Sequence, residues 1–261
     1  MLKARLLTAL VLLAGLLLVL FVFSAGQARI AFALLMALAA WEWAGLMRQD
    51  KSARGLYAGF VLVACWQLHA GGAALMGLTL LFGTIFWLLV APLWLRQGWR
   101  MRGNDMVGYG LGLVLMMACW SALVQLFERG PWVLLAAMAV VWVADSAAYF
   151  VGRAWGRRKL APAISPGKTW EGVWGALTGV LLYALMLVFF SPLPPVALLG
   201  LALLLAVLSI VGDLFESLLK RQAEVKDSGR LLPGHGGVLD RIDGLLAALP
   251  VAAWVLGRWA A

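Results

Sequence analysis

Charge is scarce in this chain of 261 residues, in which only 13% are Asp, Glu, Lys or Arg and 64% are hydrophobic. Its apolar runs exceed what a soluble core of this size could bury, which excludes an ordinary soluble domain. The chain also lacks the short alternating segments of a membrane β-barrel, because its apolar runs are long and unbroken. Since a backbone in lipid must satisfy its own hydrogen bonds, the composition predicts an all-α, polytopic membrane protein.

Cysteine is equally scarce. Cys65 and Cys119 each lie inside an apolar run without paired spacing, which favours two small buried side chains over a disulfide or a metal clip. No internal repeat or low-complexity linker divides the chain. We therefore expect one membrane domain, residues 1–261, with a charge-poor N-terminal scaffold (1–104) and a site-bearing C-terminal half (105–261).

Nine apolar runs predict about nine transmembrane helices. They cover residues 6–23, 30–47, 55–68, 73–95, 106–127, 132–151, 170–190, 196–212 and 242–259. The first run has the basic start and small-residue tail of a secretory signal, but its bilayer length favours an uncleaved span.

Basic residues indicate the orientation. With nine spans, only Arg29, Arg129 and Arg258 fall on the side opposite the N-terminus, although the formal net charge is +9. Because Lys and Arg concentrate in cytoplasmic loops, this asymmetry predicts a cytoplasmic N-terminus and a C-terminus on the opposite side. A basic excess of this kind reports orientation and contact with the lipid bilayer, so we expect no nucleic-acid partner.

Polar residues are concentrated from Asp213 to Asp243, with six acids, five bases and a histidine between apolar segments. Such residues are costly in lipid unless they meet each other, water, metal or substrate. Asp240 and Asp243 are three residues apart at the start of the last helix, so their carboxylates share a face and suit Mg²⁺. Asp213 ends the preceding span in a stripe with Ser217 and Lys220, so three acids are expected to converge. The alternative is a structural network of ion pairs.

A glycine-rich turn, P-G-H-G-G (233–237), directly precedes the last helix. Its backbone N–H groups can form an anion-binding concavity at the positive end of the helix dipole, which would suit phosphate. The alternative is a plain turn. His235 suits contact with a phosphate oxygen, although a turn histidine without a function fits the pattern equally well. Charged residues that favour the phosphate interpretation flank the turn: Lys220, Arg221, Lys226, Asp227 and the acid pair beyond.

A second polar loop precedes the helix expected at 170–190. Lys168 lies next to that helix start, which either Ser165 with Pro166 at the first helical position, or Thr169, could cap. We expect this helix start to face phosphate, whereas the run 157–159 is expected to contact lipid headgroups. Asp145 lies about two turns inside the sixth span, where an acid requires a cation, a metal or water.

The stretch S-L-L-K-R-Q-A-E-V-K-D-S-G-R-L-L-P-G-H-G-G-V-L-D-R-I-D (217–243) closely resembles the signature of phosphatidate cytidylyltransferases, also called CDP-diacylglycerol synthases. I-S-P-G-K-T-W-E-G (164–172) and A-D-S-A-A-Y (144–149) are similar to the other two motifs of that family. The resemblance implies transfer of a cytidylyl group from CTP to phosphatidic acid, giving CDP-diacylglycerol and pyrophosphate. It also implies a homodimer in the inner membrane, Mg²⁺ with K⁺ as a second cation, and a metal cluster of Asp213, Asp240 and Asp243.

On this interpretation the residues fall into two groups. The expected catalytic residues are Asp213, Asp240, Asp243, Lys226 and Asp227. The expected substrate contacts are Asp145, Ser165, Lys168, Ser217, Lys220, Arg221, His235, Gly236, Gly237 and Arg241. The phosphate monoester of phosphatidic acid is already an anionic nucleophile, so the task is to bring two polyanions together, and no strong general base is needed.

Two other functions remain open at this point. A CTP-dependent polyprenol or phytol kinase would release CDP instead of pyrophosphate. An ion-coupled transporter should show broken helices in two related halves, whereas the polar residues here occupy one half only.

Overall fold

The structure is a computed structural model that describes residues 2–101 and 106–259. Apart from one short hairpin, the described chain is helical, and the all-α prediction is confirmed. The helices are α1 Leu2–Phe21, α2 Ala25–Leu46, α3 Lys51–Ala70, α4 Gly72–Ile85, the π-helical turn η1 Phe86–Val90, α5 Ala91–Gln97, α6 Met106–Glu128, α7 Pro131–Trp155, α8 Trp170–Leu187, α9 Pro195–Gln222 and α10 Leu239–Trp259.

Length and apolarity make most of these helices candidates to cross a membrane. Within the described residues six segments qualify: α2, the continuous α4–η1–α5 segment (72–97), α6, α7, α8 and α9. The apolar part of α1, Arg5–Phe21, is slightly shorter. Helices α3 and α10 are as long as a span but less apolar. The chain is therefore a polytopic membrane protein, with nine long helical segments within the described residues where nine were predicted.

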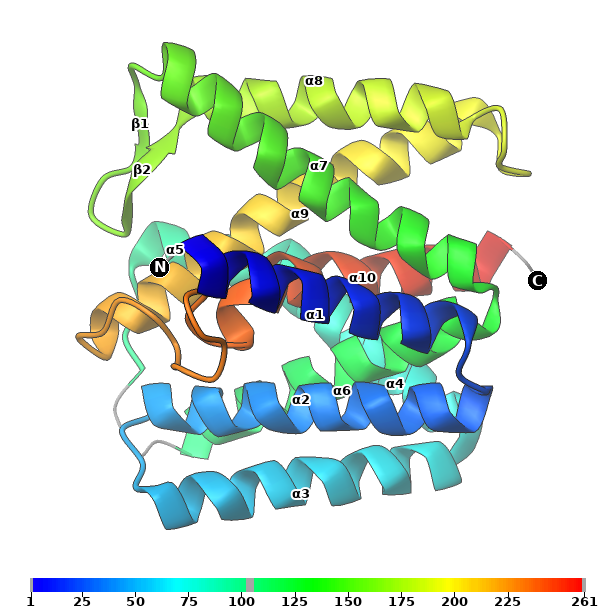
Figure 1. Ribbon diagram of the computed structural model, residues 1–261, viewed down its shortest axis with the longest axis vertical. Coiled ribbons are helices and arrows are strands. Elements are labelled where there is room, and N and C mark those ends of the chain that lie inside the picture. The colour runs from blue at the N-terminus through cyan, green and yellow to red at the C-terminus, as the bar shows by residue number, and fades with distance from the viewer. Residues whose placement is uncertain (1, 102–105, 260–261) are drawn as a thin grey trace.

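Successive helices run in opposite directions, so the connecting segments gather at two ends (Figure 1). The N-terminus, the turn at 47–50, the hairpin and the loop at 223–238 lie at one end. The turns at 22–24, at 71 and at 129–130, the segment 188–194 and the C-terminus lie at the other. We call these the N-terminal end and the C-terminal end of the bundle.

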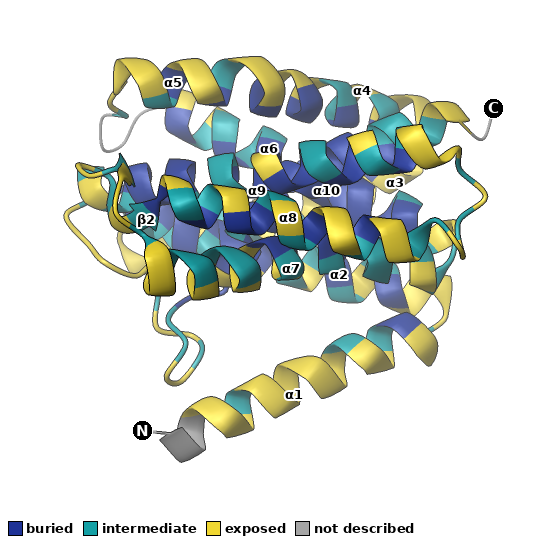
Figure 2. Ribbon diagram, turned by 90° about the horizontal axis from the view of Figure 1, so that it is seen from above, coloured by how far each residue is buried: buried dark blue, intermediate teal, exposed yellow. Residues whose placement is uncertain are grey.

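Helix α1 lies along the outside of the bundle and is exposed over most of its length (Figure 2). Leu7, Leu10 and Leu13 are more than half exposed. A long apolar helix with so little cover suits contact with lipid tails. A hydrogen bond from Thr8 Oγ1 to the carbonyl oxygen of Pro233 (3.0 Å) ties α1 to the 223–238 loop.

Small residues bring two helix pairs into close contact. On α8, a Cβ added at Gly175 would lie 2.5 Å from Val151 of α7. On α9, a Cβ at Gly212 would lie 2.4 Å from the carbonyl oxygen of Asp243 on α10, and Gly244 packs in turn against Ser209. Glycine interfaces let helix backbones approach where no side chain intervenes. The α9–α10 contact places Asp213 and Asp243 beside one another.

Several predicted boundaries were wrong. Helix α9 continues to Gln222, ten residues beyond its predicted end, so Asp213 lies inside the helix and the loop comprises only 223–238. The polar residues stay helical because they bond to each other one turn apart, as Ser217 does to Asp213. Helix α3 is also longer than the predicted third span.

The second polar loop, predicted between the sixth span and the helix at 170–190, contains a short hairpin. Strands β1 (Lys159–Ala161) and β2 (Ser165–Thr169) pair antiparallel, with Lys159 opposite Thr169. Of the two predicted caps for α8, Thr169 is correct: its Oγ1 accepts a hydrogen bond from Gly172 N (3.1 Å). Ser165 and Pro166 lie in β2 and cannot start the helix. The predicted boundary between scaffold and site-bearing half, at 104–105, lies outside the described residues.

Candidate active site

Lys168, in the 164–172 motif, forms an ion pair with Asp213, which lies four residues before the 217–243 motif. Lys168, at the end of β2, places its Nζ 2.6 Å from Asp213 Oδ2 on α9. Asp213 Oδ1 also accepts a hydrogen bond from Ser217 Oγ, one turn later (3.2 Å). Both side chains of the ion pair are partly exposed. The hairpin thus places the positive charge of Lys168 beside a carboxylate that lies within helix α9.

Asp243 and Asp145 complete a group of three acids around this ion pair. The carboxylates of Asp145, Asp213 and Asp243 repel one another electrostatically, and Lys168 offsets part of the charge on Asp145. Asp243 Oδ1 accepts a hydrogen bond from Gly244 N (2.7 Å). Three acids that share one directly paired lysine leave an excess of negative charge where α7, α9 and α10 meet, and this excess attracts cations.

Asp240 belongs to a second, adjoining cluster. Its Oδ1 lies 2.7 Å from Lys220 Nζ, and its Oδ2 accepts hydrogen bonds from Ser228 N (3.0 Å) and Gly237 N (2.8 Å). Lys220 also pairs with Glu216, and both members of that pair are largely buried. Asp240 therefore ties the 223–238 loop to α9. Lys220 also acts electrostatically on Asp243, which links the two clusters.

The glycine-rich turn is held by its own hydrogen bonds. Gly234 and Gly236 have positive φ angles (77° and 82°), which glycine adopts without strain. Within the turn, His235 N donates to Leu232 O, and Arg241 Nε donates to His235 O (3.0 Å). The Nδ1 atom of His235 is buried and has no hydrogen-bond partner among the described residues. Two N–H groups of the predicted concavity, those of His235 and Gly237, are therefore already bonded, to Leu232 O and to Asp240 Oδ2.

The remaining predicted residues lie around these clusters. Arg221 Nε donates to Ile164 O (3.2 Å), which ties α9 to the hairpin turn. Ser165 begins β2 and is half-buried. Lys226 and Asp227 are exposed in the 223–238 loop, and Lys226 makes no hydrogen bond or ion pair to the described residues. Its charge is free to meet a soluble anion.

Glu42 is a residue that the sequence interpretation missed. It lies on α2, in the half of the chain taken for a scaffold, and it is completely buried. Its Oε2 accepts hydrogen bonds from Ser228 Oγ (3.1 Å) and from Leu239 N (2.8 Å), the first residue of α10. A Cβ at Gly229 or Gly237 would collide with this carboxyl group. Glu42 therefore caps α10 from another helix and holds the loop against α2. The available signal was a lone acid inside an apolar run.

Glu216 was missed as well, although it lies inside the charged stretch. Glu216 directly follows Phe215, the aromatic anchor of α9. The Phe215 ring lies 5.4 to 5.7 Å from the rings of Phe86, Trp87 and Trp94. That aromatic cluster fixes the rotation of α9 and so directs its polar face toward α7 and α10.

The donor set fits a divalent cation held partly by substrate. Among residues 2–101 and 106–259, no three Asp, Glu, His or Cys side chains are grouped closely enough to hold a metal as they stand. Mg²⁺, however, is usually bound through one or two carboxylates, waters and substrate phosphates. Asp213 and Asp243, adjacent across the α9–α10 contact, carry carboxylate oxygens of that kind.

Comparisons with known proteins agree with the sequence motifs. The chain matches the cytidylyltransferase family over residues 3–258. It is 42% identical to the phosphatidate cytidylyltransferase of Pseudomonas aeruginosa over 279 residues, covering 100% of this chain and 98% of the relative. It is 34% identical to that of Haemophilus influenzae over 278 residues (96% of each chain) and 40% identical to that of Brucella suis over 220 residues (80% and 76%). Full-length similarity at this level shows that the chain belongs to the phosphatidate cytidylyltransferase family.

Proposed function

We propose that this chain transfers the cytidylyl group of CTP to phosphatidic acid, giving CDP-diacylglycerol and pyrophosphate. One observation carries the proposal: the three motif segments meet at a single place, where Lys168 pairs with Asp213 and the carboxylates of Asp145 and Asp243 lie within electrostatic reach. Membership of the phosphatidate cytidylyltransferase family supports the choice of substrates.

The reaction requires one bond to form and one to break. A phosphate oxygen of phosphatidic acid attacks the α-phosphorus of CTP, and the bond from that phosphorus to the bridging oxygen of the β-phosphate breaks. Pyrophosphate leaves with the electron pair. The attacking oxygen is already anionic, so no strong base is required. The main barrier is the repulsion between two polyanions, which fixed positive charges and positioning reduce.

Basic residues of this chain are placed to reduce that repulsion. When a phosphate approaches the Lys168–Asp213 pair, the ammonium group of Lys168 can turn to it as a charge-assisted donor. Lys226, exposed in the 223–238 loop, and Arg221, at the hairpin turn, offer positive charge at the same end of the bundle. Lys220 is more enclosed, between Glu216 and Asp240, and acts by holding the two helices and the loop together.

A divalent cation, Mg²⁺ in our proposal, would be held by Asp213 and Asp243 with Asp240 nearby, and would neutralise charge on the CTP phosphates and on the leaving pyrophosphate. The excess negative charge of the acid group supports this assignment. Asp145 is exposed on the side of α7 and adds to the same field. We place K⁺ as the second cation.

The membrane arrangement is part of the proposal. The N-terminal end of the bundle would face the cytoplasm, where CTP is dissolved, and the inner-membrane lipid would enter from the side. Among the described basic residues, all except Arg29, Arg129 and Arg258 lie in or next to the segments at the N-terminal end, which supports this orientation. We also propose that the enzyme works as a homodimer.

Product analysis tests the proposed function. Purified full-length protein is supplied with phosphatidic acid and CTP labelled in the base or in the γ-phosphate, with and without Mg²⁺. We expect the base label in a lipid product and the γ-label in pyrophosphate, both only with Mg²⁺. Release of CDP with the γ-label in the lipid would instead indicate a kinase, and absence of any CTP turnover would contradict the proposal.

A further inference from the structure

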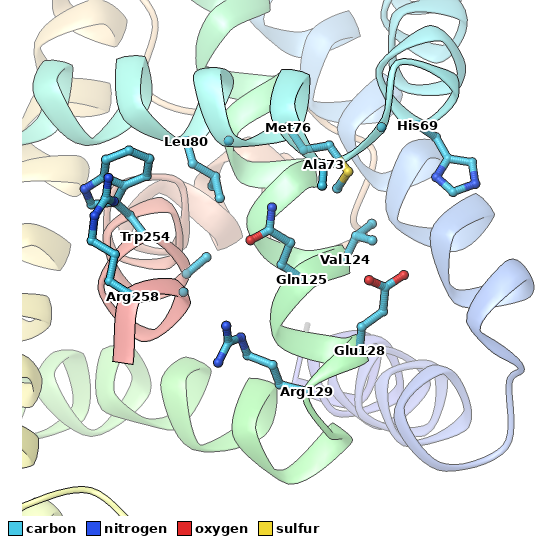
Figure 3. A pocket seen from close by; sticks show the side chains of 14 residues that line it. His69, Ala73, Met76, Leu80, Val124, Gln125, Glu128, Arg129, Trp254 and Arg258 are labelled. Atoms are coloured by element: carbon cyan, nitrogen blue, oxygen red, sulfur yellow. The ribbon is translucent and has the colours of Figure 1, made fainter. Parts of the chain in front are cut away.

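A pocket of about 470 Å³ opens at the C-terminal end of the bundle, far from the acid group. It lies between α4, α6 and α10, with His69 at the end of α3 beside it (Figure 3). Helix α10 separates the two places: Asp243 and Arg258 are 15 residues apart, which corresponds to about 22 Å of helix. The pocket is therefore distinct from the site proposed for cytidylyl transfer.

The positive charge around this pocket is unusual for its end of the bundle. Among the residues that the structure describes, three Lys or Arg residues belong to the C-terminal end, namely Arg29, Arg129 and Arg258. Arg129 and Arg258 both line the pocket, and Arg29 bonds to the lining residue Glu128 (2.8 Å). Scattered charges would be expected if these bases had no common role. Their convergence on one cavity points to an anion.

Of the three guanidinium groups at this pocket, those of Arg129 and Arg258 are available to bind an anion. Arg29 is neutralised by Glu128. Arg129 and Arg258, in contrast, have no acidic partner within 4 Å among the described residues. Arg258 is stacked on the Trp254 ring, 3.5 Å from its centroid, which holds the side chain in place without satisfying its donors. Figure 3 shows Arg129, Arg258 and Gln125 among the side chains that line the pocket.

The inner wall of the pocket is apolar. Met76 and Leu80 of α4, Val124 of α6 and Ala253 of α10 are all buried and line it. A free inorganic anion would gain nothing from this wall. A molecule with a phosphate group at one end and hydrocarbon at the other would use both the arginines and the wall.

We infer that this pocket binds the headgroup of an anionic phospholipid from the leaflet at the C-terminal end of the bundle. The phosphate would lie between Arg129 and Arg258, with the first carbons of the lipid against Met76 and Leu80. Guanidinium groups suit this role because they donate in a planar fork that matches phosphate oxygens. The inference does not depend on the proposed function, since it concerns a different ligand site.

Lipid-dependent stability tests the inference. Purified full-length protein, freed of lipid in detergent, is heated with phosphatidylglycerol, with phosphatidylcholine or with inorganic phosphate alone. A ligand that binds the folded state raises the unfolding midpoint. We expect phosphatidylglycerol to raise it, and phosphatidylcholine and inorganic phosphate to leave it nearly unchanged. An equal rise with inorganic phosphate would overturn the lipid assignment.

Three variants locate the effect. Arg129→Gln and Arg258→Gln should each weaken the apparent affinity for phosphatidylglycerol by about tenfold, the value of one charge-assisted hydrogen bond. Gly77→Leu fills the pocket, because nothing lies within 4 Å of a Cβ at that position. Gly59→Leu is the matched control, since it adds the same side chain to open space on α3, away from the pocket.

The outcomes separate clearly. The inference stands if phosphatidylglycerol stabilises the parent and Gly59→Leu but has little effect on Gly77→Leu and the two arginine variants. An unchanged response in the arginine variants would overturn it, even if Gly77→Leu does not fold. CTP turnover, measured in parallel, confirms that each variant is folded, because none of these residues belongs to the proposed active site.

Discussion

Removing the carboxyl group of Glu42 should destabilise the protein far more than removing an exposed acid. Glu42→Ala leaves two buried donors, Ser228 Oγ and Leu239 N, without the oxygen that now accepts from both. An unsatisfied buried donor costs about 1–3 kcal/mol, so the two together predict a loss of about 3 kcal/mol or more. Glu42→Gln keeps an accepting oxygen and should cost only about 1 kcal/mol.

The free energy of unfolding, measured by titration with a denaturing detergent, checks this prediction. Glu224→Ala is the control: Glu224 pairs with Arg48, but its side chain is 83% exposed, and exposed ion pairs contribute about 0–1 kcal/mol. The expected order of destabilisation is Glu42→Ala, then Glu42→Gln, then Glu224→Ala. If Glu42→Ala were no more destabilising than Glu224→Ala, the capping of α10 by α2 would be refuted.

Three further predictions concern the hairpin and the helix contacts. Lys168→Ala should lower the rate of CTP turnover on the order of 100-fold, because a preorganised hydrogen-bond donor is lost. Arg157→Ala should change that rate by about twofold or less. Equal losses of rate would contradict the assignment of Lys168 to the site and of Arg157 to the lipid headgroups. Gly212→Leu should separate α9 from α10 and abolish CTP turnover. Gly200→Leu adds the same side chain to open space on the same helix and should leave turnover intact. The rates of CTP turnover of the two variants, measured side by side, test this prediction. Thr169→Ala should lower the unfolding free energy by about 1 kcal/mol through loss of the α8 cap, and an unchanged value would count against that role.

The helices were predictable because a bilayer imposes one length and one composition on each of them. The ends of the helices were harder to predict, as α9 shows. Its last ten residues carry Asp213, Glu216 and Lys220, and a linear pattern cannot reveal that these charges are satisfied by Ser217 and by Asp240 on α10. A run of charges after a hydrophobic segment was therefore taken for a loop.

For the candidate site, the sequence could indicate residues but not their contacts. It singled out Lys168, Asp213 and Asp243 as candidates, but it did not predict that Asp240 pairs with Lys220 in a separate cluster. That pairing depends on how the 223–238 loop folds back, which the sequence does not display. Glu42 was missed because its partners lie 186 and 197 residues away. The short hairpin was missed because strands of three and five residues are too short to leave a periodic signal.

Pyrophosphate release by Asp243→Asn tests the central claim most directly. The substitution keeps the shape of the side chain and removes the charge that lies beside Asp213, so the proposed cation would lose one of its ligands. The account predicts that Mg²⁺-dependent release of pyrophosphate from CTP and phosphatidic acid falls to background, while the unfolding midpoint stays close to that of the parent protein. Full activity in the folded variant would contradict the account.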